Sequence, residues 1–173
     1  MILNNVCFKK KPIAAGAVFT VSLALAVLYK PSVLPAQTRQ EEVARRGAKV
    51  MPFDLEQTTH VFQKLDDGGL QKVVVKDPSN KKQIALIQAH LKEESEKFRQ
   101  GDFSDPAKIH DENMPGLANL KAGPRKIDVR YTALPDGAQI RYTTKDSQLI
   151  AALHQWFDAQ LSDHGRHATG HMH

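Results

Sequence analysis

Short runs of alternating apolar and polar residues occur in two pairs, and an Asp-Gly turn separates the members of each pair. The runs cover residues 58–64 (TTHVFQK), 70–75 (LQKVVV), 126–132 (KIDVRYT) and 139–144 (QIRYTT). A period of two with many β-branched residues predicts half-buried strands. Asp-Gly between such runs predicts a hairpin, because glycine readily takes the positive φ of a tight turn.

A helix is expected after each hairpin. Asp77 is the expected N-cap of the first helix, with Pro78 at its first position and Gly101 at its end, and Asp146 caps the second. Apolar residues recur at helical spacing in both segments: Ile84, Ile87, Leu91 and Phe98 in the first, and Leu149, Ile150, Leu153, Phe157 and Leu161 in the second.

The two ββα segments match at a constant offset of 69 residues in their turns and in the Lys-Asp pairs that follow. They predict an α+β fold, in which two ββα units form a four-stranded, mostly antiparallel sheet with both helices on one face. Chance similarity of two ordinary ββα units is the alternative to a true repeat. The connection at 101–123 is long, with a helix start at Asp105 and a break at Met114-Pro115-Gly116.

The first 36 residues resemble a secretory leader. Lys9, Lys10 and Lys11 precede seventeen uncharged residues at 13–29, and Pro31 to Ala36 follow. We expect a signal peptide at 1–36, cleaved near Ala36, or else an N-terminal anchor that would be the only membrane contact. The predicted order is then a linker or short exposed helix at 37–50, the α+β domain at 51–165, and a flexible His-rich tail at 166–173.

The net charge of +5 comes mainly from this leader, which holds four of the 24 basic residues and no acidic residue. The remaining 20 basic residues face all 19 acidic residues, so the rest is nearly neutral and nucleic-acid binding is disfavoured. The single cysteine, Cys7, also lies in the leader. A cleaved chain would therefore bind metals through His, Met, Asp and Glu only.

Each predicted helix carries a histidine four residues before a carboxylate, His90 with Glu94 and His154 with Asp158. Residues i and i+4 share a helix face, so each pair offers the nitrogen and oxygen ligands of a metal site. Adjacent helices would join the pairs into one quasi-symmetric site. The alternative is that both histidines are partly buried and hydrogen-bonded to their carboxylates.

Three further groups have ligand chemistry. His110 with Met114 combines imidazole and thioether, which suits copper, although Met114 is also an ordinary loop hydrophobe. His60 shares a strand face with Phe62, so it is either a buried histidine or a cleft residue. The tail gives the strongest metal signal, since a flexible chain with several imidazoles can wrap Cu²⁺ or Zn²⁺; the alternative is a plain polar terminus. Its candidate ligands are His164, His167, His171, Met172 and His173.

Several longer stretches carry a family resemblance: RGAKVMPFDLEQTTHVFQKLDDGGLQ, GDFSDPAKIH followed by MPGL, LPDGAQIRY and WFDAQLSDHG. Together they span most of residues 46–165. They resemble a family of small exported bacterial proteins that is often labelled aspartate carbamoyltransferase. That enzyme is a longer two-domain protein with a Ser-Thr-Arg-Thr loop for carbamoyl phosphate, and no such tetrapeptide occurs in this sequence. The resemblance therefore implies a coherent domain and carries no activity over.

The sequence thus predicts an exported, periplasmic metal-binding protein for copper or zinc, in metal handling or sensing. No Gly-x-Ser-x-Gly, phosphate-binding glycine loop or HExxH motif points to an enzyme. Two alternatives stay open. One is a small periplasmic hydrolase or transferase-like enzyme that uses the His/carboxylate pairs in an inter-helix cleft. The other is a cell-envelope interaction module without a cofactor.

Overall fold

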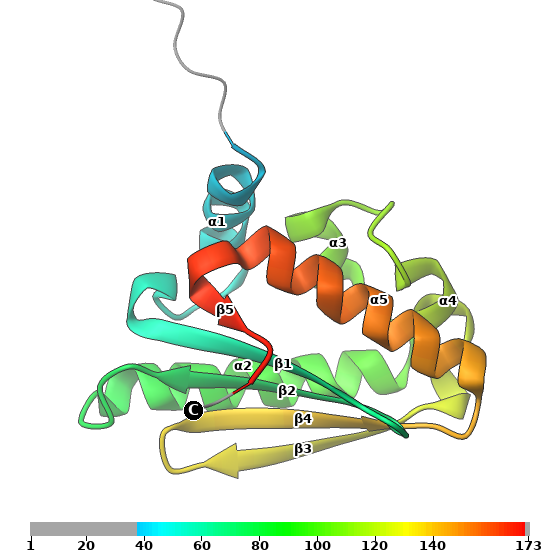
Figure 1. Ribbon diagram of the computed structural model, residues 1–173. Helices are drawn as coiled ribbons and strands as arrows, with labels where there is room; N and C mark the ends of the chain where they lie inside the picture. The colour runs from blue at the N-terminus through cyan, green and yellow to red at the C-terminus, as the bar shows by residue number, and fades with distance from the viewer. Residues whose placement is uncertain (1–37, 172–173) are drawn as a thin grey trace, which may run out of the picture. The chain divides into compact units, whose positions relative to one another are not determined.

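The computed structural model describes residues 38–171. This part of the chain forms five α-helices, three short 3-10 helices and one sheet. Figure 1 shows their arrangement. The helices are α1 (Arg39–Val50), α2 (Lys81–Arg99), α3 (Ser104–His110), α4 (Leu117–Ala122) and α5 (Ser147–His164), and the 3-10 helices are η1 (Leu55–Gln57), η2 (Pro124–Lys126) and η3 (Gly165–His167). The strands are β1 (Thr58–Leu65), β2 (Gly68–Val75), β3 (Asp128–Leu134), β4 (Gly137–Thr143) and β5 (Ala168–Thr169).

The sheet has five strands in the order β3-β4-β2-β1-β5. Both predicted hairpins form, and β2 and β4 join them in an antiparallel pair. The prediction of an α+β fold is confirmed, but the prediction of four strands is wrong. The fifth strand comes from the C-terminal segment and pairs parallel with β1, where Ala168 lies opposite His60. A two-residue strand is too short for any alternation to reveal it.

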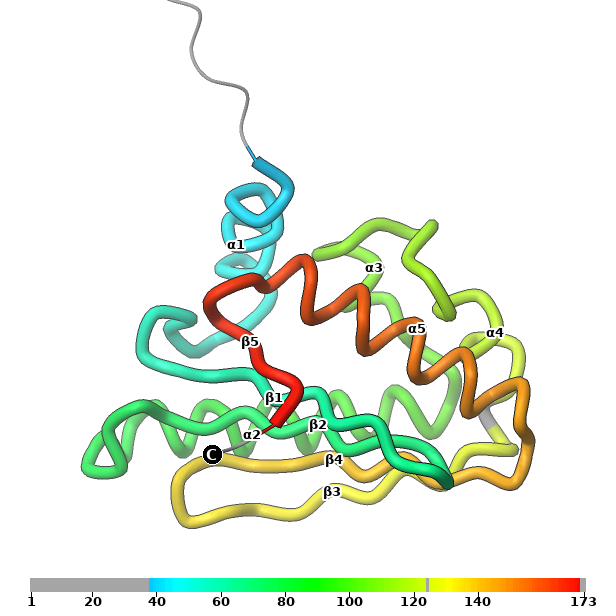
Figure 2. The backbone as a smooth tube through the Cα atoms, viewed as in Figure 1, coloured from blue at the N-terminus to red at the C-terminus, as the bar shows by residue number. Residues whose placement is uncertain are grey.

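The two long helices pack on the same face of the sheet (Figure 2). The ring of Phe157 on α5 lies 5.4 Å from Phe62 on β1 and 5.9 Å from Tyr142 on β4. On α2, Phe98 lies 6.2 Å from the same tyrosine. The aromatic residues of this face therefore pack against the helices, and the core of the domain lies between the sheet and the two helices.

The start of α5 agrees with the sequence and the start of α2 does not. The Asp146 carboxylate accepts hydrogen bonds from the amides of Gln148 and Leu149, as an N-cap does. Asp77 instead accepts from the amide and hydroxyl of Ser79, which closes a turn. Asn80 then caps α2. Asp77 accepts from Ser79 in a turn and does not cap a helix, so α2 begins after Asn80 and not at Pro78.

Of the segment predicted at 37–50 as a linker or short exposed helix, residues 38–50 form a capped helix that packs on the domain. Thr38 and Glu41 form a reciprocal capping box at the start of α1. Val43 and Gly47 are buried on the inner side of the helix. The polar composition of this segment gave no sign of the packing, because only one valine and one glycine of the helix are buried.

The folded domain also extends beyond residue 165. The segment from Gly165 to Thr169 forms η3 and β5, and His167 is buried. The predicted flexible tail from 166 is therefore wrong for its first residues, because pairing with β1 satisfies their backbone groups. The predicted leader, Cys7, Met172 and His173 lie outside the described residues. Among the helices of residues 38–171, none is long and apolar enough to cross a membrane.

Gly116 fixes the connection between α3 and α4 against α5. Its φ is 78°, and a Cβ there would lie 2.1 Å from the carbonyl oxygen of Ala152. We expect Gly116→Ala to lower the free energy of unfolding by about 2–4 kcal/mol. The alanine would have to adopt a left-handed backbone conformation, and its Cβ would also clash with the backbone of α5. Gly170→Ala is the matched control, since its nearest neighbour is Leu161 Cδ1 at 3.9 Å. Urea denaturation measures both, and equal losses would contradict the prediction.

Candidate functional site

A partly open cavity of about 50 Å³ lies between the sheet, α2, α3, α5 and the end of α1. A space of this size accommodates a few water molecules or an ion, and it is much smaller than the pockets that hold organic cofactors and drug-sized ligands. More than half of the lining residues are apolar. The polar part consists of His60, Gln71, His90, Glu94, Asp105, His110, Gln160 and His164.

Two helical stripes form opposite walls of this cavity. On α5, Trp156, Gln160 and His164 follow at intervals of four residues, so all three face the same side. On α2, His90, Glu94 and Phe98 follow at the same interval. The rings of Phe98 and Trp156 lie 6.0 Å apart. Each helix thus presents polar groups to the space between them.

Three imidazoles from separate elements gather at one end of the cavity, which we call the histidine end: His60 (β1), His110 (α3) and His164 (α5). His60 stacks on His164 with centroids 4.7 Å apart, and His110 stands edge-on to His164 at 5.0 Å. Burial, and to a lesser extent the neighbouring histidines, lower the pKa of His60 to about 3. Burial also lowers the pKa of the other two. All three rings are therefore neutral at pH 7 and keep a lone pair.

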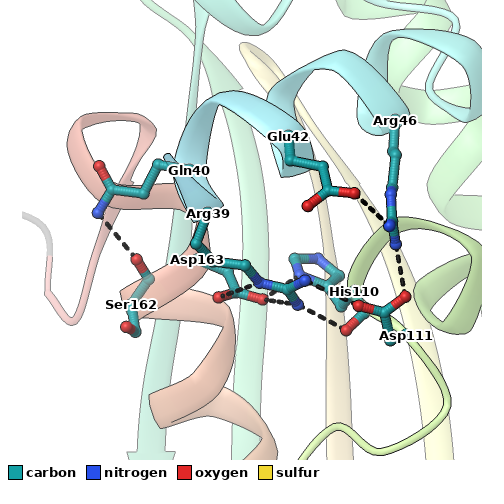
Figure 3. A network of polar contacts seen from close by, with 8 residues as sticks. All are labelled: Arg39, Gln40, Glu42, Arg46, His110, Asp111, Ser162 and Asp163. Atoms are coloured by element: carbon teal, nitrogen blue, oxygen red, sulfur yellow. Dashed lines mark hydrogen bonds and ion pairs between the residues drawn. The ribbon is translucent and has the colours of Figure 1, made fainter. Parts of the chain in front are cut away.

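A carboxylate fixes the orientation of His110. Its Nδ1 lies 2.8 Å from Asp163 Oδ2, and Arg39 binds the same carboxylate through Nε at 3.1 Å and Nη2 at 2.7 Å (Figure 3). Burial acts to raise the pKa of Asp163, but hydrogen bonds from Arg39 and His110 outweigh it and lower this pKa. An ionised carboxylate accepts the Nδ1 proton, so the lone pair of neutral His110 lies on Nε2.

Arg39 also holds α1 against α3 beside the cavity. Arg39 Nη2 donates to the His110 carbonyl at 2.6 Å, and its Nη1 pairs with Asp111 at 2.8 Å. Arg46 binds the other oxygen of Asp111 at 2.6 Å. Val50 and Met51, at the end of α1, line the cavity. The helix thus covers the histidine end and holds the groups that orient His110.

A carboxyl group lines another part of the cavity. Burial raises the pKa of Glu94 to about 7, although its hydrogen bond from Lys97 opposes the shift. Lys97 Nζ lies 3.0 Å from Glu94 and 2.7 Å from Asp105. Burial acts to raise the pKa of Asp105, but Lys108 and Lys97 outweigh it and keep this group ionised. Glu94 is therefore the cavity carboxyl that changes charge near neutral pH.

The predicted quasi-symmetric site does not form. His90 and Glu94 line the cavity, but His154 Nε2 lies 3.0 Å from the Leu65 carbonyl and 2.9 Å from the Gly68 carbonyl. Asp158 pairs with Lys64 at 2.7 Å on the surface. His154 stands outside the Trp156 stripe of α5, so it fastens the β1–β2 turn instead of facing α2.

The other predicted ligands are also dispersed. Met114 is buried in the hydrophobic core and does not line the cavity. It shares a separate, open surface pocket with His110. His167 is buried beside β1, with Nε2 3.4 Å from Glu56. His171 is exposed, and its carbonyl accepts from the Thr169 hydroxyl. Of the tail histidines in the described part, only His164 reaches the cavity.

Sequence reasoning missed Arg39, Trp156, Gln160 and the role of Asp163. The interval of four from Trp156 through Gln160 to His164 was the available signal for one shared face. No signal marked Arg39, which lies 71 residues before His110 in the chain. Within residues 38–171, no three His, Cys, Asp or Glu side chains are already arranged around a metal position.

The fold and the cavity together define an α+β domain with a histidine-lined interior. Comparison with family models, curated proteins and solved structures gives no match to this chain. The resemblance to the exported family therefore stays a prediction, and the function has to be argued from the cavity.

Proposed function

We propose that this is an exported protein that binds one copper or zinc ion at the histidine end, through His60, His110 and His164, in metal handling or sensing. The observation that carries the proposal is the Asp163–His110 pair beside two more neutral imidazoles. Histidine ligands in metal sites commonly donate their second ring N–H to a carboxylate, which fixes the tautomer and makes the ligand more basic.

The spacing of the rings supports one shared ion. With metal–nitrogen distances of about 2.0–2.1 Å and tetrahedral angles, two coordinated imidazoles have centroids roughly 5 Å apart. The observed separations from His164 are 4.7 Å to His60 and 5.0 Å to His110. Parallel stacked rings cannot both point at one ion, so binding requires a ring rotation at His60 or His164.

The charge and the ligand types agree with this assignment. A divalent ion in a buried space needs nearby negative charge. Asp163 supplies it behind His110, and Glu94 supplies it once it loses its proton. Three neutral imidazoles suit both copper and zinc. The thioether of Met114, which favoured copper in the sequence, lies outside the cavity, so the choice between the two metals rests on imidazole alone.

Fluorescence titration with Cu²⁺ tests the proposal, because Trp156 is the only tryptophan of the chain and lines the cavity. We expect saturable quenching at one Cu²⁺ per chain, and an increase of melting temperature with Zn²⁺. Truncation after Gly170 and His154→Gln serve as controls, and both are expected to bind with wild-type affinity. Loss of binding in the truncated chain would move the site to the tail and refute the proposal.

A further inference from the structure

Three buried polar atoms on the cavity wall have no hydrogen-bond partner among the described residues. They are His60 Nδ1, Trp156 Nε1 and Gln160 Oε1. The only other such atom in the described part is His167 Nδ1. Buried polar groups in folded proteins are nearly always paired, and leaving one unpaired is unfavourable. Their gathering at one cavity points to a polar ligand there.

The chemistry of these atoms limits that ligand. Indole Nε1–H can only donate, so a metal ion cannot satisfy Trp156. The ligand must therefore present an acceptor atom to the indole. The Gln160 amide can offer either its oxygen or its NH₂ group, and so it tolerates a neutral or an anionic ligand. A metal ion bound by His60 would satisfy His60 Nδ1. Trp156 Nε1 and Gln160 Oε1 would still need a hydrogen-bonding partner, which a second ligand beside the metal would provide.

The positions along α5 set the direction in which that component extends from the ion. Gln160 lies one turn and Trp156 two turns before His164, which is roughly 6 Å and 12 Å along the helix axis. The cavity volume of about 50 Å³ limits the ligand to a few heavy atoms. A three-histidine site has an open fourth position, which exchangeable ligands occupy in catalytic sites and protein ligands close in structural sites.

We propose that the metal ion of the histidine end carries a small exchangeable ligand, a neutral or anionic molecule of one to three heavy atoms, seated against Trp156 and Gln160. This inference rests on the proposed function and adds that the coordination sphere is open. The ligand donates a lone pair to the ion, displaces a bound water, and accepts a hydrogen bond from the indole.

Azide is a suitable probe, because it is triatomic, anionic and accepts hydrogen bonds. We expect azide to shift the visible absorption of the Co²⁺-loaded full chain in a saturable way. Trp156→Phe should raise the azide Kd about tenfold, as expected for one lost hydrogen bond to a charged ligand, and change the Co²⁺ affinity less than twofold. Tyr131→Phe, on β3 and outside the cavity lining, is the matched control.

A second measurement needs no variant. With a single tryptophan in the chain, the ¹H–¹⁵N spectrum has one indole signal, and azide should move it downfield in the Zn²⁺-loaded protein but not in the metal-free protein. An unchanged spectrum of the loaded protein, or equal azide affinity in Trp156→Phe, overturns the inference while metal binding stands. Failure of Co²⁺ to bind refutes the proposed function first, and the inference falls with it.

Discussion

Lowering the pH from 7 to 5 is expected to unfold the metal-free protein. The cause is the set of four histidines around the cavity, His60, His90, His110 and His164, whose pKa values are all lowered mainly by burial. In the unfolded chain each regains an ordinary pKa near 6.5. The unfolded state therefore binds more protons below pH 6.5, and the stability that these groups contribute is lost as the pH falls toward their folded pKa values.

The expected loss is comparable to the whole stability of a domain. At pH 5, a histidine that stays neutral in the fold costs up to about 2 kcal/mol, so four cost up to about 8 kcal/mol. Glu94 acts in the opposite direction. Its pKa is raised to about 7, so its contribution grows as the pH falls from 7 toward 4.5, and it offsets roughly 2–3 kcal/mol. The net loss is then at most about 5 kcal/mol, which reaches the lower range of domain stabilities.

Urea denaturation at pH 7, 6 and 5 measures this dependence, with circular dichroism as the signal. His60→Gln should flatten the slope by nearly one proton, and Tyr131→Phe, which changes a residue outside the cavity lining, should leave it unchanged. Saturating Zn²⁺ should move the transition to lower pH, because metal binding competes with protonation. Equal stability at pH 7 and pH 5 would mean that these histidines take up protons within the fold.

The parts of the fold that the sequence predicted are those that local patterns determine. The hairpins around Gly68 and Gly137 and the cap at Asp146 depend on residues within a few positions, and each formed as expected. The error at Asp77 is also local, because Asp77 accepts from the amide and hydroxyl of the nearby Ser79 and Asn80 caps the helix instead. The strand β5 depends on a distant partner, β1, and two residues carry no pattern that reveals it.

The sequence allowed the residues of the candidate site to be predicted, but not how they are paired and oriented. His60, His90, Glu94, His110 and His164 do line one cavity. Helical periodicity alone suggested a pairing of His90 with His154, but the faces of α2 and α5 that meet are set by core side chains. Orientation of His110 depends on Asp163 and on Arg39, which lie 53 and 71 residues away from it. Tertiary packing determines which helix faces meet and how His110 is oriented. No local sequence pattern reports on that packing.

Replacement of His164 by glutamine is expected to lower the affinity for Cu²⁺ or Zn²⁺ more than a hundredfold. His164 is the central ring of the histidine end, since it contacts both His60 and His110. Its loss leaves two nitrogen ligands from β1 and α3, too few for the tetrahedral arrangement that zinc prefers. Glutamine keeps similar volume and polarity, so the fold should persist, and at pH 5 the variant should be more stable than wild type because one buried neutral imidazole is absent.

Competition against a chelator of known affinity measures the loss, and Trp156 fluorescence confirms that the variant is folded. His90→Gln is the matched control, because His90 lines the same cavity but lies outside the histidine end. We expect this control to change affinity less than tenfold. Equal losses in the two variants would show that binding follows the general polarity of the cavity, whereas a loss confined to His90→Gln would place the ion beside Glu94. A selective loss in His164→Gln, retained after truncation beyond Gly170, assigns the ion to the three rings that β1, α3 and the end of α5 bring together.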